Sequence, residues 1–144
     1  MSDQSRASDQ SQGDAVHQGG CLCGAVRYKT TGTPNDTNIC YCTQCQRQSG
    51  APLPAFANFN MDQFEIVQGE LGSYQASDIA TRQFCPSCGS WLFWVREGGT
   101  RISITLGSFD DPSDFPTPDY EIWTEHRIKW LSNIPGAKSY PGDN

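Results

Sequence analysis

The sequence predicts a small, mainly β domain with many turns and little helix. Short runs of β-branched and aromatic residues alternate with polar residues, most clearly in 26–30 and 102–106, and Gly, Pro, Asn and Asp separate the runs. Helical signals are few: 43–49 fits one short helical turn, and 119–131 is ambiguous. Only 36% of the 144 residues are hydrophobic. We therefore expect something besides apolar burial to help hold the domain together.

These runs indicate one domain preceded by a tail. A chain of 144 residues can build one modest core but not two independent ones. Residues 1–18 are rich in Ser, Gln and Asp with almost nothing to bury, and we expect them to form a disordered tail. A single domain is expected over 19–144. Its expected strands are 25–30, 37–41, 55–60, 64–68, 73–75, 79–84, 91–96 and 101–106.

Composition argues against several classes of protein. No stretch approaches the roughly 20 apolar residues of a membrane span, and 1–20 lacks the apolar run of a secretory signal. Ten Lys and Arg against sixteen Asp and Glu give a net charge of −6, which disfavours nucleic acid or an anionic membrane as a partner. We expect a cytoplasmic protein, and in that reducing compartment persistent disulfides are rare.

Seven cysteines, an odd number, fall into three clusters, and two of these have the spacing of metal half-sites. In Cys85-x-x-Cys88, Pro86 fixes φ at the start of a turn that can bring both sulfurs to one ion. In Cys21-x-Cys23, the one-residue spacing on an extended strand would put both side chains on one face. Together they predict a structural four-cysteine zinc site that closes a long loop. A redox pair, a disulfide or unliganded thiols are the alternatives.

The middle cluster has three thiols within six residues, at Cys40, Cys42 and Cys45. Three protein ligands on zinc leave a fourth position for water or substrate, which distinguishes a catalytic zinc from a structural one. His17 or His126 could close the shell instead, although neither lies close in sequence. A second structural zinc is the alternative to an open site.

The three clusters with their flanking residues resemble a known family. The similarity is carried by 19–28 (GGCLCGAVRY), by 40–45 (CYCTQC) followed by Ser49 and Gly50, and by 84–89 (FCPSCG). Near the C-terminus, 118–123 (PDYEIW) and 129–131 (KWL) resemble the closing segment of the same family. The chain thus resembles the glutathione-dependent formaldehyde-activating enzymes, a family that includes the centromere protein V type of domain.

The resemblance implies a zinc-stapled fold of several small β-sheets and two zinc ions with different roles. It implies that one ion is structural and is held by Cys21, Cys23, Cys85 and Cys88. It implies that the other ion is reactive and is held by Cys40, Cys42 and Cys45. It also implies a carbon–sulfur lyase that joins glutathione to formaldehyde. Two positions depart from the common pattern, because Tyr41 stands where many relatives have His and Gln46 where many have a basic residue. The substrate is therefore the least defined part of the implied function.

A thiol coordinated to zinc loses its proton, so glutathione is a chemically reasonable partner for a small electrophile at the middle cluster. Its two carboxylates need donors, and Arg47 is the nearest cation in sequence. Arg27, Arg82 and Arg127 are further candidates, and Tyr41 could donate to an oxyanion. Two other kinds of function stay open: a non-catalytic, zinc-stabilised interaction domain and a thiol or metal sensor. Oligomeric state is not predicted.

Overall fold

The structure is a computed structural model that describes residues 15–143, so residues 1–14 of the expected tail at 1–18 lie outside the described residues. It confirms a mainly β domain with two sheets and, within the described part, one short α-helix. No helix of that part is long and apolar enough to cross a membrane. The elements are β1 (Val16–Gly20), β2 (Arg27–Thr31), β3 (Asp36–Cys40), α1 (Thr43–Ser49), β4 (Ala55–Asn60), β5 (Phe64–Gln68), β6 (Gly72–Ser77), β7 (Ala80–Phe84), β8 (Trp91–Arg96), β9 (Arg101–Thr105), β10 (Tyr120–Ile122) and β11 (Lys138–Ser139), with 3-10 turns η2 (Met61–Gln63), η3 (Leu106–Ser108), η4 (Pro112–Asp114) and η5 (Thr124–His126).

Strand β1 begins earlier than the sequence predicts. Its first three residues belong to the segment that we expected to be a disordered tail. β1 pairs with β2 along its whole length through backbone hydrogen bonds, which need no apolar side chains. His17 also packs on Phe115, with ring centroids 4.8 Å apart. The expected boundary at residue 18 therefore falls inside a strand.

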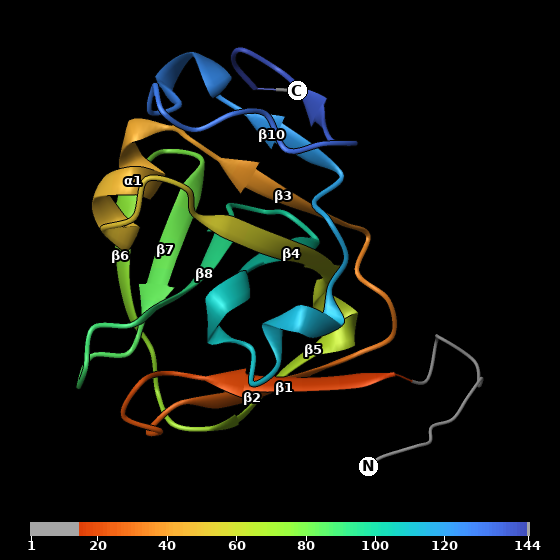
Figure 1. Ribbon diagram of the computed structural model, residues 1–144. Helices are drawn as coiled ribbons and strands as arrows, with labels where there is room; N and C mark the ends of the chain where they lie inside the picture. The colour runs from red at the N-terminus through yellow and green to blue at the C-terminus, as the bar shows by residue number, and fades with distance from the viewer. Residues whose placement is uncertain (1–14, 144) are drawn as a thin grey trace.

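The smaller sheet has the antiparallel order β1-β2-β5 and covers one face of the larger one (Figure 1). Aromatic rings join the two sheets: the ring of Phe93, from β8, lies 5.2 Å from that of Tyr28 and 5.0 Å from that of Phe64. Such pairs prefer tilted or edge-to-face contacts like these. The Tyr28 hydroxyl lies 2.6 Å from the Ser108 hydroxyl, so its polar end is satisfied inside the core. The core thus lies between the two sheets.

The larger sheet has eight strands in the order β11-β10-β3-β4-β9-β8-β7-β6. Successive side chains on its strands point to opposite faces. On the inner face, the core receives Ala57, Phe59, Phe93, Ile102 and Ile104. On the outer face, the alternate positions are Asn38, Cys40, Phe56, Asn58, Trp94 and Ser103, and these line a cleft. One sheet therefore supplies both a core wall and a site wall.

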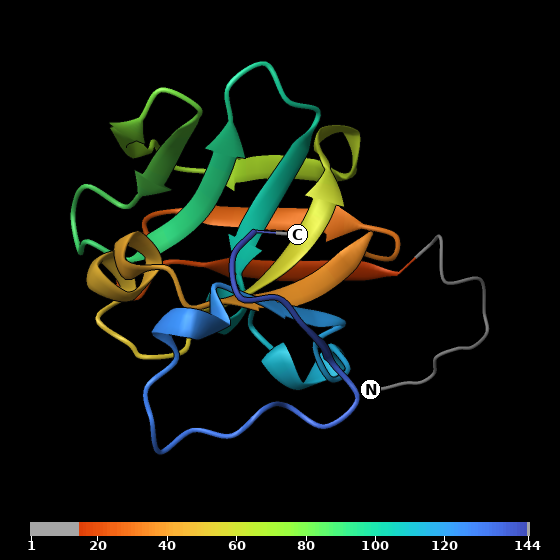
Figure 2. The ribbon, with the colours of Figure 1, turned by 90° about the horizontal axis from the view of Figure 1, so that it is seen from above.

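Helix α1 confirms the prediction for 43–49 and has an identifiable start and end. Cys42 is its N-cap, and the Cys42 sulfur accepts a hydrogen bond from the Cys45 backbone N–H. Gly50 ends the helix with φ of 70°, a left-handed conformation that glycine adopts without strain. The ambiguous segment 119–131 is not a helix. It forms the three-residue strand β10 and the turn η5, which lies beside α1 (Figure 2).

A buried carboxylate fixes the C-terminal segment to the sheet. Strand β10 pairs in parallel with β3 and with β11, and it places Glu121 fully out of solvent. Glu121 accepts hydrogen bonds from the Tyr41 hydroxyl at 2.5 Å, the Ile134 backbone N–H at 3.1 Å and the Ser139 hydroxyl at 3.2 Å. Arg127 lies 3.4 Å from the same carboxylate. Because every partner comes from a different segment, the carboxylate holds these segments together.

We expect Glu121→Ala to lower the free energy of unfolding by about 3–5 kcal/mol, because it leaves the half-buried Arg127 without its counter-charge and the buried Tyr41 hydroxyl without its acceptor. Glu65→Ala is the matched control, since Glu65 is 62% exposed and lies 3.7 Å from Lys29 at the surface. Its loss should cost about 0–1 kcal/mol. Urea unfolding measures both values. Equal effects of the two substitutions would show that the buried carboxylate does not hold the C-terminal segment.

Candidate metal centres and cleft

The cysteine sulfurs form two groups, and each group could hold a metal ion. The larger group combines the turn between β1 and β2 with the turn between β7 and β8, and its ligand atoms all lie within 4.8 Å of one another. Its members are Cys21, Cys23, Cys85 and Cys88. All seven cysteines of the chain are free thiols, so the disulfide alternative does not apply. This grouping is the one that the spacing in the sequence predicts.

The local geometry of this group differs from the prediction in one respect. Cys21 and Cys23 do not lie on an extended strand but in a turn, where the Gly24 backbone N–H donates to the Cys21 carbonyl at 3.1 Å. The turn, and not strand alternation, brings their sulfurs to 3.6 Å. The second turn ends at Gly89, whose φ of 82° is a left-handed conformation that glycine adopts without strain.

The smaller group contains the sulfurs of Cys40, Cys42 and Cys45, from the end of β3 and from the start of α1. No further His, Cys, Asp or Glu of residues 15–143 joins it within the same 4.8 Å. Hydrogen bonds from the thiols of Cys40 and Cys45 hold the pKa of Cys42 far below its usual value, and the charge of Arg82 acts in the same direction. Cys42 therefore carries the thiolate character of the cluster, whereas its hydrogen bond with Cys42 raises the pKa of Cys40.

Arg82, from β7, is a charged group in contact with the three-cysteine cluster. It is only 5% exposed, and its two terminal nitrogens lie 3.8 and 3.9 Å from the Cys45 sulfur. The side-chain oxygens of Gln44 and Gln48 accept from the same nitrogens at 3.0 and 3.1 Å. The guanidinium carbon lies 5.2 Å from the centre of the Trp91 ring. Four contacts thus hold one positive charge against the sulfurs.

A cleft of about 780 Å³ opens beside the three-cysteine cluster. All three of these cysteines line it, whereas none of the four cysteines of the larger group does. Its walls include the aromatic residues Phe56, Trp94, Trp123 and His126 and the cations Arg82, Arg96 and Arg101. The rings of Trp123 and His126 are stacked, with centroids 6.2 Å apart. This is the shape and composition of a small-molecule site.

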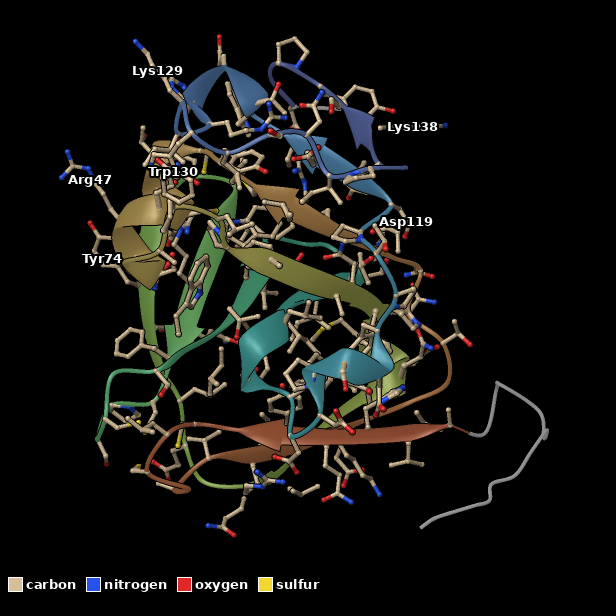
Figure 3. The ribbon with its side chains drawn as sticks, in the orientation of Figure 1. Arg47, Tyr74, Asp119, Lys129, Trp130 and Lys138 are labelled. Atoms are coloured by element: carbon tan, nitrogen blue, oxygen red, sulfur yellow. The ribbon has the colours of Figure 1, made fainter. Side chains whose placement is uncertain are left out.

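The other residues that the sequence suggested do not meet in this cleft. Arg47 is exposed and lies outside the cleft lining, and Figure 3 shows its side chain pointing away from the fold on α1. Arg27 makes a bidentate pair with Asp110, which lowers the pKa of that carboxyl. His17 lies on β1, packed against the aromatic residues of the core.

Tyr41 has a structural position instead of the oxyanion contact that we considered. It is fully buried, and its hydroxyl donates to Glu121. Burial and this hydrogen bond raise the pKa of Tyr41 to about 12. Arg127 stacks on the Tyr41 ring at 5.2 Å and pairs with the same carboxylate. Neither side chain lines the cleft.

The comparisons with known proteins identify the family. The model of the glutathione-dependent formaldehyde-activating enzyme family matches residues 16–126. The chain belongs to this family. A putative glutathione-dependent formaldehyde-activating enzyme of Halomonas elongata is 27% identical over 124 residues, which cover 79% of this chain and 78% of the relative. The family resemblance that the sequence motifs predict is thereby confirmed.

Two further relatives extend the comparison. An uncharacterized lyase of Schizosaccharomyces pombe is 29% identical over 84 residues, which are 58% of this chain and 60% of the lyase. A crystal structure of a Rhodobacter sphaeroides protein superposes with a TM-score of 0.54 at 21% identity, covering 85% of this chain and 98% of that protein. That likeness shows a shared fold.

Sequence reasoning missed most of the cleft of this family member. Asn38, Asn58, Trp94 and Arg96 come from three different strands, and no local motif marks them. The one available signal is strand alternation, because Asn38 shares a face of β3 with Cys40. Arg82 was considered only as a carboxylate donor, whereas its guanidinium contacts a cysteine sulfur.

We expect Arg82→Met to weaken metal binding at the three-cysteine cluster. Loss of a group that contacts a ligand typically costs about 10- to 100-fold in metal affinity. A chelator competition measures this loss of affinity for the zinc ion that the protein binds more weakly. Arg82→Lys should restore part of the affinity, and Arg96→Met, in the same cleft, should leave it unchanged. Unaltered zinc affinity in Arg82→Met would contradict an electrostatic role for Arg82.

Proposed function

We propose that the protein is a zinc-dependent carbon–sulfur lyase that joins glutathione, or a similar thiol, to formaldehyde or another small electrophilic carbonyl compound. One observation carries the proposal: the cluster with three thiols and no fourth protein ligand within residues 15–143 opens on the 780 Å³ cleft, while the four-thiol cluster lies outside it. A complete ligand set suits a structural ion, and an incomplete set beside a cleft suits a reactive one.

The residues present fit zinc. A tetrahedral ion with Zn–S bonds of about 2.3 Å requires sulfurs about 3.8 Å apart. The sulfur of Cys23 lies 3.6 Å from that of Cys21 and 3.8 Å from that of Cys85. An all-thiolate donor set also selects zinc or another soft ion over magnesium or calcium. We assign the structural ion to Cys21, Cys23, Cys85 and Cys88, and the reactive ion to Cys40, Cys42 and Cys45.

A bound zinc would supply an open coordination position at which a substrate thiol loses its proton. The residues of the chain do the rest. Arg82 would offset part of the negative charge of three thiolates, and the stacked rings of Trp123 and His126 with Trp94 would form apolar walls for the substrate. Glu121 holds Tyr41 in place, and Tyr41 lies between two of the ligating cysteines, so this contact orients the cluster.

The proposed reaction is an addition with no redox change. The thiolate sulfur forms a bond to the carbonyl carbon, the carbonyl π bond becomes a hydroxyl, and the proton released by the thiol ends on that oxygen. The product with glutathione and formaldehyde is S-hydroxymethylglutathione. In the reverse direction the carbon–sulfur bond breaks, which is the sense in which the enzyme is a lyase.

The two cysteine groups should respond differently to loss of one ligand. A structural zinc site contributes about 10 kcal/mol or more, against a typical domain stability of about 5–15 kcal/mol. We therefore expect Cys85→Ser to abolish soluble expression. Cys42→Ser should give a folded protein that lacks one zinc, because its cluster closes no long loop. Circular dichroism and zinc analysis of both variants test this assignment. An unfolded Cys42→Ser would make both sites structural.

The activity itself is tested by mixing metal-loaded protein with glutathione and formaldehyde and following the adduct by NMR exchange. We expect acceleration over the spontaneous reaction, and its loss in Cys42→Ser. We expect Arg47→Ala to leave the KM for glutathione unchanged, because Arg47 lies outside the cleft. A higher KM would instead support the carboxylate contact that the sequence suggests. No acceleration by protein that holds two zinc ions would overturn the proposed function and favour the interaction-domain or sensor alternatives.

A further inference from the structure

Two buried asparagines lie on the cleft wall next to the three-cysteine cluster. Asn38 is on β3 and Asn58 on β4, and each is 6% exposed. Both line the cleft. A buried carboxamide is costly unless its donors and acceptors are used, so their hydrogen bonds indicate what they are for.

The orientation of both carboxamides is fixed by Asp36. A carboxylate can only accept hydrogen bonds, so Asn58 must turn its Nδ2 toward Asp36, at 2.6 Å. The second hydrogen of that nitrogen goes to the Asn38 Oδ1 at 2.9 Å. Arg101 pairs with the other Asp36 oxygen at 3.1 Å and holds it in place. The chain of bonds therefore leaves no freedom to exchange nitrogen and oxygen in either asparagine.

The arrangement leaves one donor and one acceptor free. The Asn38 Nδ2 and the Asn58 Oδ1 make no hydrogen bond with any described residue, and neither is among the buried polar atoms that lack a partner. Both atoms are therefore accessible, and because both residues line the cleft, we infer that this donor and acceptor face it. A fixed donor beside a fixed acceptor matches the C=O and N–H that one extended peptide residue presents on the same edge.

We propose that Asn38 and Asn58 form a subsite for the two peptide groups of a peptidyl thiol, a cysteine acylated at its nitrogen and amidated at its carboxyl. Asn38 Nδ2 donates to the carbonyl of the cysteinyl residue, and Asn58 Oδ1 accepts from its N–H. This inference rests on the proposed function, since it assigns the residues that would recognise the thiol substrate in the same cleft.

The position of the subsite relative to the cluster supports this class. Asn38 precedes Cys40 by two residues on β3, so both side chains lie on one face about 6.6 Å apart. The sulfur of a cysteinyl residue is three bonds from its own backbone nitrogen. A ligand whose sulfur meets the cluster thus brings its peptide groups to the asparagines. A thiol without peptide groups would use the cluster alone.

The experiment compares two uncharged thiols on the metal-loaded, full-length protein by NMR titration. N-acetylcysteinamide has both peptide groups and no carboxylate, and 2-mercaptoethanol has neither. We expect the first to bind about tenfold more tightly, as two neutral hydrogen bonds allow. The side-chain NH₂ signal of Asn38 is assigned from its absence in the spectrum of Asn38→Ala. This signal should shift with N-acetylcysteinamide and stay in place with 2-mercaptoethanol.

Asn38→Asp keeps the oxygen that Asn58 needs and replaces the free donor, so it should remove the preference for N-acetylcysteinamide. Asn38→Ala should also remove the preference for N-acetylcysteinamide. It tests the same donor without adding a charge, in case the charge of Asn38→Asp disturbs the fold. Ser103→Ala is the matched control, because Ser103 lies opposite Asn58 on β9 and lines the same cleft. It should keep the preference.

Two negative results are distinguishable. If the protein forms the glutathione–formaldehyde adduct but binds both thiols equally, the subsite is wrong and the proposed function stands. If neither thiol binds protein that holds two zinc ions, the subsite and the proposed function are both overturned. A preference that survives Asn38→Asp and Asn38→Ala would also overturn the subsite.

Discussion

Side-chain alternation in the eight-stranded sheet is the constraint on which both the core and the cleft depend. Each strand must give its successive residues to opposite faces, so a residue cannot be exchanged between core and site without shifting the register of its strand. On β4, Ala57 and Phe59 face the core, while Phe56 and Asn58 face the cleft. The same division continues on β8 and β9. The position of the cleft opposite the core is thus a direct consequence of the pairing, and its floor is as rigid as the sheet itself.

Two sets of contacts, which we call tethers, connect this sheet to the small sheet and to the C-terminal segment. The four-cysteine group joins the turn that follows β1 to the turn before β8, so it ties the small sheet to the large one. At the other end, Glu121 joins β10 to the loop that carries Cys40 and Cys42. The three-cysteine cluster lies next to the second tether, through Tyr41, and is contacted by Arg82 from β7. Its ligands are therefore held by parts of the chain that are distant in sequence.

The sequence predicts the β class, both cysteine groups and most of the central strands. Strands 55–60, 64–68 and 91–96 match the structure residue for residue, because their flanking turn residues define them locally. The strands that were missed, β1, β10 and β11, are short or polar, and they exist because a neighbour offers backbone groups to pair with. The cleft is missed for a similar reason: Asn58, Trp94 and Arg82 come together only through strand order. Arg47 is adjacent to the cluster in sequence, yet helix α1 directs it outward.

The parallel pairing of β10 with β3 has a consequence for the order of folding. These strands are separated by roughly 80 positions, and chains are synthesised from the N-terminus at about 5–20 residues per second. The cysteines of the middle cluster therefore emerge from the ribosome well before Glu121 exists to accept the hydrogen bond of Tyr41. Contacts between such distant positions form slowly. The nascent chain thus presents all three thiols before β10, the strand that pairs with β3 beside them, has been made.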